Sequence, residues 1–339
     1  MQNATPGSTV SSQDDGCAPR EQATRPFRFG VVNENPVPLD DWLAHVREVE
    51  ALGYNTFLIR DHVIDPPFGP QYAPLVALAM AAAATTRLRV GTLVLSNDFR
   101  HPVLLAKELA TLDALSGGRL EIGIGAGWLR AEYDGAGWTF DRPGLRIERL
   151  AESLTILRGL LSGNTVTFEG AHYQVRGLQT FPLPTQRPMP PLLVGGGNPR
   201  MLRLAGREAD MVSMLTTSVA SGEVRDDPSE RTVAAVERKL GWIREGAGER
   251  FQQIELNLIP TLIPTDDPQR AAADLIAQRG WEGVSVDDVL QMPSLLFGGS
   301  DMMVQTLRAR RERFGFSYYV VSDGDLHAFA PVVAALAGQ

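Results

Sequence analysis

The stretch from residue 88 to residue 128 constrains the fold most, because it holds a complete strand–helix–strand unit. It reads LRVGTLVLSNDFRHPVLLAKELATLDALSGGRLEIGIGAGW, in which an amphipathic segment separates two short apolar runs. Both runs end in polar or glycine-rich residues, which is typical of strands that end at turns. Strands joined by a helix pair in parallel. This unit is the repeat of barrels whose chemistry sits at the carboxyl ends of the strands.

Eight apolar runs of this kind follow one another from Phe27 onward, separated by amphipathic segments. They predict strands at 27–33, 56–60, 88–96, 119–125, 191–196, 209–215, 253–260 and 317–322. Eight strands that alternate with helices predict an α/β fold of the (β/α)8 TIM-barrel type. The length of 339 residues fits one such barrel of about 250 residues with insertions.

The spacing between these strands predicts the domain organisation. The intervals after the fourth and seventh strands are too long for plain loops, so we expect insertions at about 128–190 and 261–300 in a single domain spanning 26–339. Residues 1–25 are rich in Ser, Gln, Asp, Gly and Pro, which predicts a disordered tail that is not a secretory signal. The longest apolar run, around 75–84, is too short to span a bilayer. We therefore expect a cytoplasmic protein with no membrane partner.

Charge and cysteine content exclude several classes of function. The net charge of −8 provides no basic field for nucleic acid or for an anionic membrane. The one cysteine, Cys17, lies in the predicted tail, which argues against disulfides, thiolate metal sites and a catalytic thiol. The histidines do not follow metal-ligand spacing, so no metal site is expected. The expected partner is a small molecule, whose anionic groups would be held by local arginines and backbone amides.

The predicted fifth strand ends in a glycine-rich turn of Gly195, Gly196, Gly197 and Asn198, with Arg200 just beyond. Glycines let several N–H groups point one way, Asn198 can cap the following helix, and Arg200 adds a positive charge. The turn is therefore a candidate phosphate cradle. The alternative interpretation is a helix start that needs a tight turn. The spacing matches neither the Walker motif nor G-x-G-x-x-G.

The predicted fourth strand ends in Gly123, Gly125, Gly127 and Trp128. The third glycine comes one residue too early for a dinucleotide fingerprint, and no long apolar helix follows. These glycines either let a planar ligand approach the backbone or serve barrel packing, and the sequence leaves both interpretations open.

Arg60, Asp61 and His62 follow the second predicted strand. An aspartate beside a histidine at the carboxyl rim of a barrel can orient an imidazole that exchanges protons near neutral pH. The alternative is a histidine with a purely structural hydrogen bond. His101, before Pro102, is instead predicted to start a helix. The chain shows neither a serine nucleophile elbow nor paired carboxylates at consecutive strand ends, which disfavours hydrolases.

Several segments together resemble the luciferase-like monooxygenase superfamily. They are DH after the second strand, ATTRLRVGTLVL, RHPVLLAKELATLDALSGGRLEIGIGAGW, RIERLAESLTIL and PPLLVGGGNPRMLRLA. The resemblance extends from Phe27 to Ala335. It is greatest to the actinobacterial branch of oxidoreductases that depend on coenzyme F420, a deazaflavin, whereas sister branches use FMN.

The resemblance implies an insertion-decorated barrel with the cofactor ring in its mouth. It implies a non-prolyl cis peptide near Leu95–Ser96, with Asn97 beside it, at the border of the cofactor. It also implies that the turn at 195–197, with Asn198 and Arg200, binds the ribityl-phosphate arm of the cofactor.

One histidine and one departure from the family pattern bear on the reaction. His62 matches the histidine that deazaflavin dehydrogenases of the superfamily place beside the reacting ring carbon. Sugar-oxidising relatives carry a glutamate after the glycines of the fourth strand, where this chain has Trp128. We therefore expect hydride transfer from reduced deazaflavin to an activated C=C or C=N bond of a small organic substrate. His62 would exchange the proton, and Asp61 would steady His62.

Two other functions stay open at this point. One is an FMNH2-dependent monooxygenase that uses O2 and receives reduced cofactor from a separate reductase, and the other is a non-catalytic flavin-binding protein. Relatives imply a homodimer. Substrate specificity is expected to lie in the insertion at 128–190 and in the polar loop at 216–227, a candidate lid.

Overall fold

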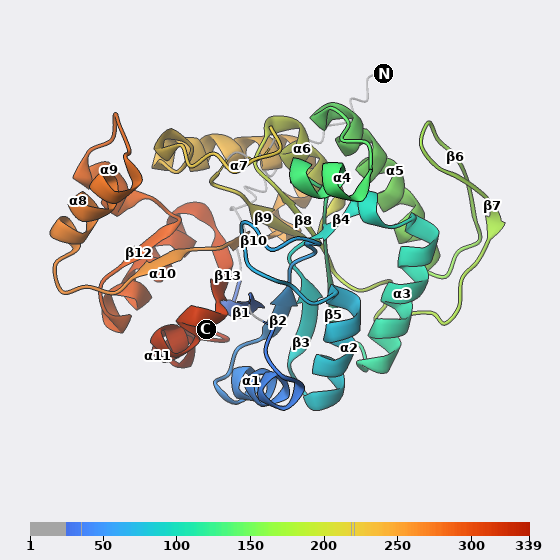
Figure 1. The fold of residues 1–339 in the computed structure, drawn as a ribbon, viewed down its shortest axis with the longest axis horizontal. Coiled ribbons are helices and arrows are strands. Elements are labelled where there is room, and N and C mark those ends of the chain that lie inside the picture. The colour runs from blue at the N-terminus through green and yellow to red at the C-terminus, as the bar shows by residue number, and fades with distance from the viewer. Residues whose placement is uncertain (1–24, 35, 218, 220) are drawn as a thin grey trace, which may run out of the picture.

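In the computed structural model, residues 25–34, 36–217, 219 and 221–339 are described. Of the predicted tail, residues 1–25, only Arg25 is among the described residues. The described residues form a closed ring of parallel strands surrounded by helices (Figure 1). The prediction of an α/β fold with a (β/α)8 TIM barrel is therefore confirmed.

The strands of the barrel are β1 (Arg28–Asn33), β2 (Thr56–Ile59), β3 (Arg89–Thr92) with its continuation β4 (Leu95–Ser96), β5 (Leu120–Gly125), β8 (Leu192–Gly196), β9 (Met211–Met214), β10 (Glu255–Leu258) and β13 (Phe316–Ser322). They pair in parallel in the order β3-β2-β1-β13-β10-β9-β8-β5, and the pairing of β3 with β5 closes the ring. Every predicted strand is present within a few residues of its expected bounds. The carboxyl ends of all the strands consequently meet at one rim.

The third predicted strand is interrupted between β3 and β4. The non-prolyl cis peptide lies there, at Leu93–Val94, so its predicted position near Leu95–Ser96 is wrong by two residues. Leu95 and Ser96 instead pair with Ile124 and Gly125 of β5 as ordinary strand residues. The cis bond falls in the break between the two paired segments.

The helices are α1 (Leu39–Ala51), α2 (Pro74–Ala84), α3 (Pro102–Leu115), α4 (Arg130–Ala136), α5 (Pro143–Leu161), α6 (Pro199–Glu208), α7 (Val233–Ala247), α8 (Pro268–Arg279), α9 (Val286–Gln291), α10 (Ser300–Phe314) and α11 (Leu326–Leu336). In α1, the buried residues Trp42, Val46 and Val49 recur at helical spacing and form the face that packs on the barrel. His101 caps α3 by accepting a hydrogen bond from the N–H of Val103, as predicted. Within the described residues, none of the helices combines the length and the hydropathy that crossing a bilayer requires.

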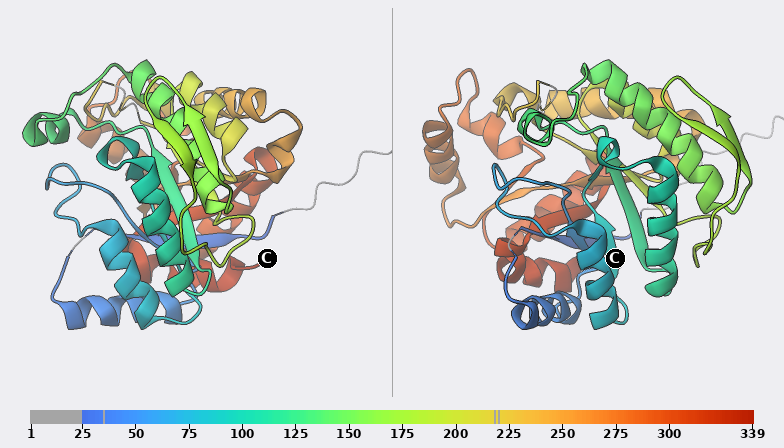
Figure 2. Two further views of the ribbon diagram at one scale, coloured as in Figure 1. Left: turned by 90° about the vertical axis from the view of Figure 1, so that its right-hand side faces the viewer. Right: turned by 45° about the vertical axis from the view of Figure 1, so that its right-hand side comes forward.

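The first long interval, after β5, holds α4, α5 and the antiparallel hairpin of β6 (Val166–Glu169) and β7 (Gln174–Leu178). The hairpin lies along the outer side of α5 (Figures 1 and 2). The carboxylate of Glu152 on α5 accepts hydrogen bonds from the N–H groups of Ala171, His172 and Tyr173, at 2.7, 2.9 and 3.0 Å. These bonds hold the hairpin against the helix.

The second long interval, after β10, holds α8, α9 and the parallel pair of β11 (Thr261–Ile263) and β12 (Leu295–Phe297). This unit has a small apolar core of its own, which includes Trp281, Met292 and Leu295. It projects on the side of the barrel opposite the β6–β7 hairpin (Figures 1 and 2).

The amino end of the barrel is closed by an ionic network. Arg28 at the start of β1 pairs with Glu121 of β5 and, at 2.7 Å, with Glu255 of β10. The hydroxyl of Tyr318 donates to the other oxygen of Glu121 at 3.2 Å. An apolar layer that includes Leu58, Leu193 and Val320 lies within the barrel. Together these side chains fill the interior below the carboxyl rim.

Candidate active site

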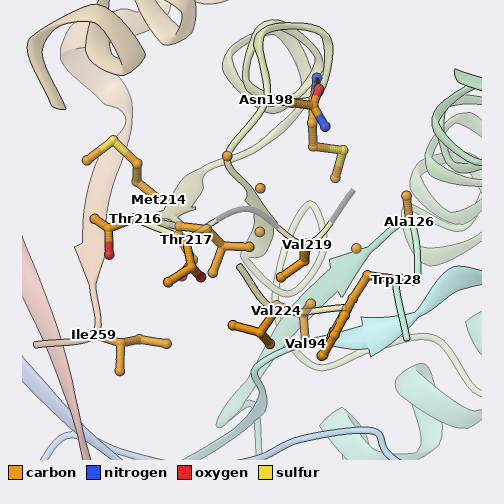
Figure 3. A pocket seen from close by; sticks show the side chains of 18 of the residues that line it. Val94, Ala126, Trp128, Asn198, Met214, Thr216, Thr217, Val219, Val224 and Ile259 are labelled. Carbon is orange, nitrogen blue, oxygen red and sulfur yellow. Dashed lines mark hydrogen bonds between the residues drawn. The ribbon is translucent and has the colours of Figure 1, made fainter. Parts of the chain in front are cut away.

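A cavity of about 680 Å³ opens at the carboxyl rim of the barrel. It is lined by residues that follow β2, β4, β5, β8, β9 and β10 (Figure 3). The predicted site residues that line it are Asp61, His62, Leu95, Ser96, Gly125, Gly127, Trp128, Gly195, Gly196, Gly197 and Asn198. The sequence pattern therefore brings most of its candidates into one cavity.

Two candidates lie outside the cavity lining. Asn97 is fully buried, and its side-chain amide donates to the hydroxyl of Tyr173 at 3.3 Å. Arg200 lies on the outer surface of α6, where it pairs with Glu148 at 2.8 Å. The second residue of α6 thus projects onto the neighbouring helix α5, which is the physical reason that Arg200 does not reach the cavity.

His62 forms a buried pair with Glu132, the third residue of α4. The Nδ1 atom of His62 lies 3.0 Å from Oε1 of Glu132, and that oxygen also accepts the N–H of Val63 at 2.7 Å. A carboxylate only accepts hydrogen bonds, so Nδ1 carries the proton and Nε2 is left for proton exchange with a ligand. The rings of Trp128 and Phe68 lie 5.8 and 5.1 Å from the imidazole and limit its movement.

Asp61 does not steady His62 in the predicted way. Its Oδ2 accepts the N–H of Ser96 at 3.0 Å and an N–H of Arg100 at 2.6 Å, and its Oδ1 accepts a second N–H of Arg100 at 3.1 Å. Neighbouring side chains of an extended segment point in opposite directions. Asp61 therefore fixes the end of β4, and Glu132 takes the orienting role that was predicted for Asp61.

The loss of a glutamate at position 128 does not leave His62 without a carboxylate. Glu132 follows Trp128 by four residues, and the helix α4 turns it back toward the histidine. The sequence analysis missed Glu132. It placed the glycine-rich end of β5 and Trp128 in the site but not the residues of α4 that follow them.

The glycines of the rim make room for Val94. A Cβ atom at Gly125 would lie 3.0 Å from one methyl group of Val94, and one at Gly195 would lie 3.3 Å from the other. Gly127 has a φ of +73°, and a Cβ atom there would lie 2.0 Å from the hydroxyl of Tyr133. Packing thus requires a glycine at 127 and leaves little space for a side chain at 125 and 195, and all three glycines line the cavity.

The part of the cavity near Asn198 contains features that suit an anion. Asn198 caps α6, with its Oδ1 accepting the N–H of Met201 at 2.9 Å. The first residue of α5, Pro143, lines the same space. The amino ends of both helices thus provide positive potential there.

Arg146 of α5 also lines the cavity and carries a positive charge. Its side chain is 2% exposed, stacks on Phe140 and donates from Nη1 to the carbonyl of Asp141 at 2.8 Å. Burial lowers the pKa of the guanidinium, although Tyr133 and Asp98 oppose the shift. Its buried Nε has no hydrogen-bond partner among the described residues. A buried guanidinium with an unpaired donor is able to bind an anion, and the sequence analysis did not single out Arg146.

Comparison with known proteins defines the class to which this barrel and rim cavity belong. A family model described as luciferase-like monooxygenase matches residues 24–294. An F420-dependent glucose-6-phosphate dehydrogenase from Microbacterium testaceum (strain StLB037) is 30% identical over 279 residues, which cover 80% of each chain.

Two solved structures have the same fold. The coenzyme F420-dependent tetrahydromethanopterin reductase from Methanopyrus kandleri matches with a TM-score of 0.71 and 19% identity, over 92% of this chain and 100% of that one. The monooxygenase RslO1 from Streptomyces bottropensis matches with a TM-score of 0.68 and 21% identity, over 91% of this chain and 99% of that one. At these identities the two structures show the shared fold alone.

The chain therefore belongs to the luciferase-like monooxygenase family, as the resemblance implied. It is an enzyme of that superfamily.

Proposed function

We propose that this protein is a coenzyme F420-dependent oxidoreductase that transfers a hydride to a small organic substrate. The observation that carries the proposal is the buried pair of His62 and Glu132 in a cavity whose other end suits a phosphate. The relatives named for F420 dependence support the choice of cofactor. When bound, coenzyme F420 supplies the hydride-transfer chemistry, for which no side chain in the cavity is equipped.

The residues present fit this cofactor. The cavity volume of about 680 Å³ lies within the range of small-molecule sites. Arg146, the turn at 195–197 and Asn198 would hold the phosphate of the ribityl arm. Trp128 and Val94 supply apolar surface for a planar ring. The unpartnered Nε of Arg146 is the specific observation behind this assignment.

His62 is the residue that exchanges the proton. Glu132 holds Nδ1 and stabilises the positive charge that the imidazole carries when it is ready to donate. Nε2 then delivers a proton to the substrate atom that does not receive the hydride, so that one hydride and one proton add across the double bond. We propose an activated C=C or C=N bond as the acceptor, because Trp128 stands where sugar-oxidising relatives carry a glutamate.

A turnover assay tests this proposal. Reduced F420 is mixed anaerobically with cyclohexenone or with a cyclic imine, and the return of the oxidised deazaflavin absorbance is followed. We expect substrate-dependent oxidation of F420. The same protein with FMNH2 and air is monitored with an oxygen electrode, and we expect no substrate-dependent oxygen uptake. Oxygen uptake would favour the monooxygenase, and cofactor binding without turnover across the panel would favour a non-catalytic protein.

The homodimer and the separate reductase stay predictions. Light scattering after size exclusion measures the mass of the assembly, and the assay with chemically reduced cofactor shows whether a reductase is needed for turnover.

A further inference from the structure

We infer that the end of the cavity near His62 takes an uncharged, mainly apolar substrate and excludes phosphorylated sugars. The inference rests on the proposed function and narrows its substrate class. The inferred substrate class also differs from the substrate in the name of the relatives, which is glucose 6-phosphate.

Apolar side chains contribute to the cavity around His62. The rings of Phe68 and Trp128 contact the imidazole, and Val94, Val219 and Val224 also line the cavity. In the close-up view, the side chains of Val94, Trp128, Val219 and Val224 gather in the centre of the cavity (Figure 3). With Trp128 and Val94 assigned to the cofactor ring, a substrate near Nε2 meets the apolar side chains of Phe68, Val219 and Val224.

Four cationic side chains line the cavity among the described residues: Arg60, Arg146, Arg225 and Arg231. Neither of the two lysines of the chain, Lys107 and Lys239, contributes to the lining. A bound phosphate dianion would need at least one of these arginines to be free, because transfer of an unpaired anion from water into a protein interior is costly.

Arg60 is already neutralised. Its guanidinium pairs with the carboxylate of Glu34 and stacks over the ring of Phe68 at 4.5 Å. The other oxygen of Glu34 accepts the hydroxyl of Ser322. Glu34 is thus held in place, and Arg60 has no net charge to offer a substrate.

Arg231 is fully engaged by hydrogen bonds. Its Nε and Nη2 atoms lie 2.7 and 2.6 Å from Oδ1 of Asp226. Its Nη1 donates to the hydroxyls of Ser294 and Thr216, at 3.2 and 3.4 Å. The residue is 7% exposed. Every nitrogen of this guanidinium therefore already has a protein acceptor.

The two remaining arginines are not offered to a substrate phosphate. Arg146 stacks on Phe140 and lies near Tyr133 of α4, and the proposed function assigns its unpartnered Nε to the phosphate of the cofactor. Arg225 is exposed at the rim, where water and salt weaken its attraction for an anion. The carboxylate of Glu132 also lines the cavity and repels an anion. An uncharged substrate avoids all of these costs.

The test compares ligands on the F420-saturated protein. Calorimetric titration with cyclohexenone, glucose and glucose 6-phosphate is carried out on the oxidised complex, and turnover of each compound is measured in parallel. We expect cyclohexenone to bind at least about tenfold more tightly than glucose 6-phosphate. Equal or tighter binding of glucose 6-phosphate, or its turnover, overturns the inference. If F420 binds normally but neither cyclohexenone nor glucose 6-phosphate binds, the inference is also overturned. The cofactor assignment then stays intact. Failure to bind F420 counts against the proposed function instead.

Two variants release the paired arginines. Glu34→Gln frees Arg60, and Asp226→Asn frees Arg231, so each should improve the binding of glucose 6-phosphate by about tenfold. Two independent variants are used because Asp226 also pairs with Arg279 at 2.6 Å, and its loss can destabilise the fold.

The matched control is Glu148→Gln, which frees Arg200 outside the cavity. This variant should leave the affinity for glucose 6-phosphate unchanged. If folded Glu34→Gln and Asp226→Asn proteins behave like the control, neutralised arginines are not what excludes the phosphate, and the inference is wrong.

Discussion

His62 and Glu132 are 70 residues apart in sequence, yet Nδ1 of the histidine lies 3.0 Å from a carboxylate oxygen of the glutamate. The histidine follows β2 and the glutamate belongs to α4, so the closed barrel is what brings them together. The glutamate is buried and the histidine is partly buried, with side-chain exposures of 2% and 10%. This contact places one oriented acid–base group at the rim of the cavity.

Replacing His62 removes the proton-exchange group without altering the phosphate end of the cavity. We expect His62→Ala to lower kcat by about 10²- to 10⁴-fold and to change the Kd for F420 by no more than about twofold. Steady-state kinetics and fluorescence titration measure the two quantities. His101→Ala, at the start of α3, is the matched control and should keep full activity. Unchanged turnover of His62→Ala would show that His62 has no role in proton transfer.

Replacing Glu132 tests the orienting role. Glu132→Gln keeps an oxygen that can accept the N–H of Val63 but removes the charge beside Nδ1. Hydrogen bonds to charged groups contribute about 1.5–3 kcal/mol, so we expect kcat to fall by about 10- to 100-fold. Asp134→Asn, on the exposed side of the same helix, should have no effect. Equal kcat values for the two variants would contradict the assignment.

Arg146 and Arg200 give opposite expectations for cofactor binding. Arg146→Gln should raise the Kd for F420 by about tenfold or more, because it removes the buried cation at the phosphate end. Its effect on the deazaflavin headgroup without phosphate should be small. Arg200→Gln should leave both Kd values unchanged, since Arg200 pairs with Glu148 outside the cavity. Fluorescence titration measures all four constants, and a larger effect at Arg200 would reverse our placement of the phosphate.

Glu152 gives a prediction for stability and pH. Partial burial would raise its pKa, but the N–H groups of His172, Ala171 and Tyr173 lower it below the usual value. A carboxyl group whose pKa is lowered by folding stabilises the protein above its unfolded-state pKa, and the benefit is lost as pH falls through the folded-state pKa. Glu152→Gln should therefore lower the free energy of unfolding by about 1 kcal/mol at pH 7.

Urea unfolding measures this difference. It should shrink as the pH falls through the lowered folded-state pKa, where the wild-type carboxyl group becomes protonated. Glu169→Gln, exposed on the same hairpin, is the control and should match the wild type at both pH values. A difference that persists at low pH would mean that Glu152 acts through packing rather than through its charge.

The barrel was predictable because apolar runs and amphipathic segments alternate along the whole chain. The turns at the rim were also predictable. In a parallel barrel, a residue that directly follows a strand lies at the carboxyl rim. His62, Trp128 and Asn198 reached the cavity by this rule.

The partners of these residues were not predictable, because they depend on the direction of individual side chains. Asp61 is next to His62 in sequence but turns toward Ser96 and Arg100. Arg146 differs from the exposed arginines of the chain only in its burial, which depends on how α5 packs. Asn97 follows a rim strand and is nevertheless directed into the core.

Titration of the cofactor-free protein with F420, in parallel with FMN, tests the central claim most directly. Fluorescence is recorded for each ligand with the wild type and with Arg146→Gln. We expect saturable binding of F420, tighter than that of FMN and weakened by the substitution. No affinity for F420, or a clear preference for FMN, would contradict the account of the cavity as a deazaflavin site.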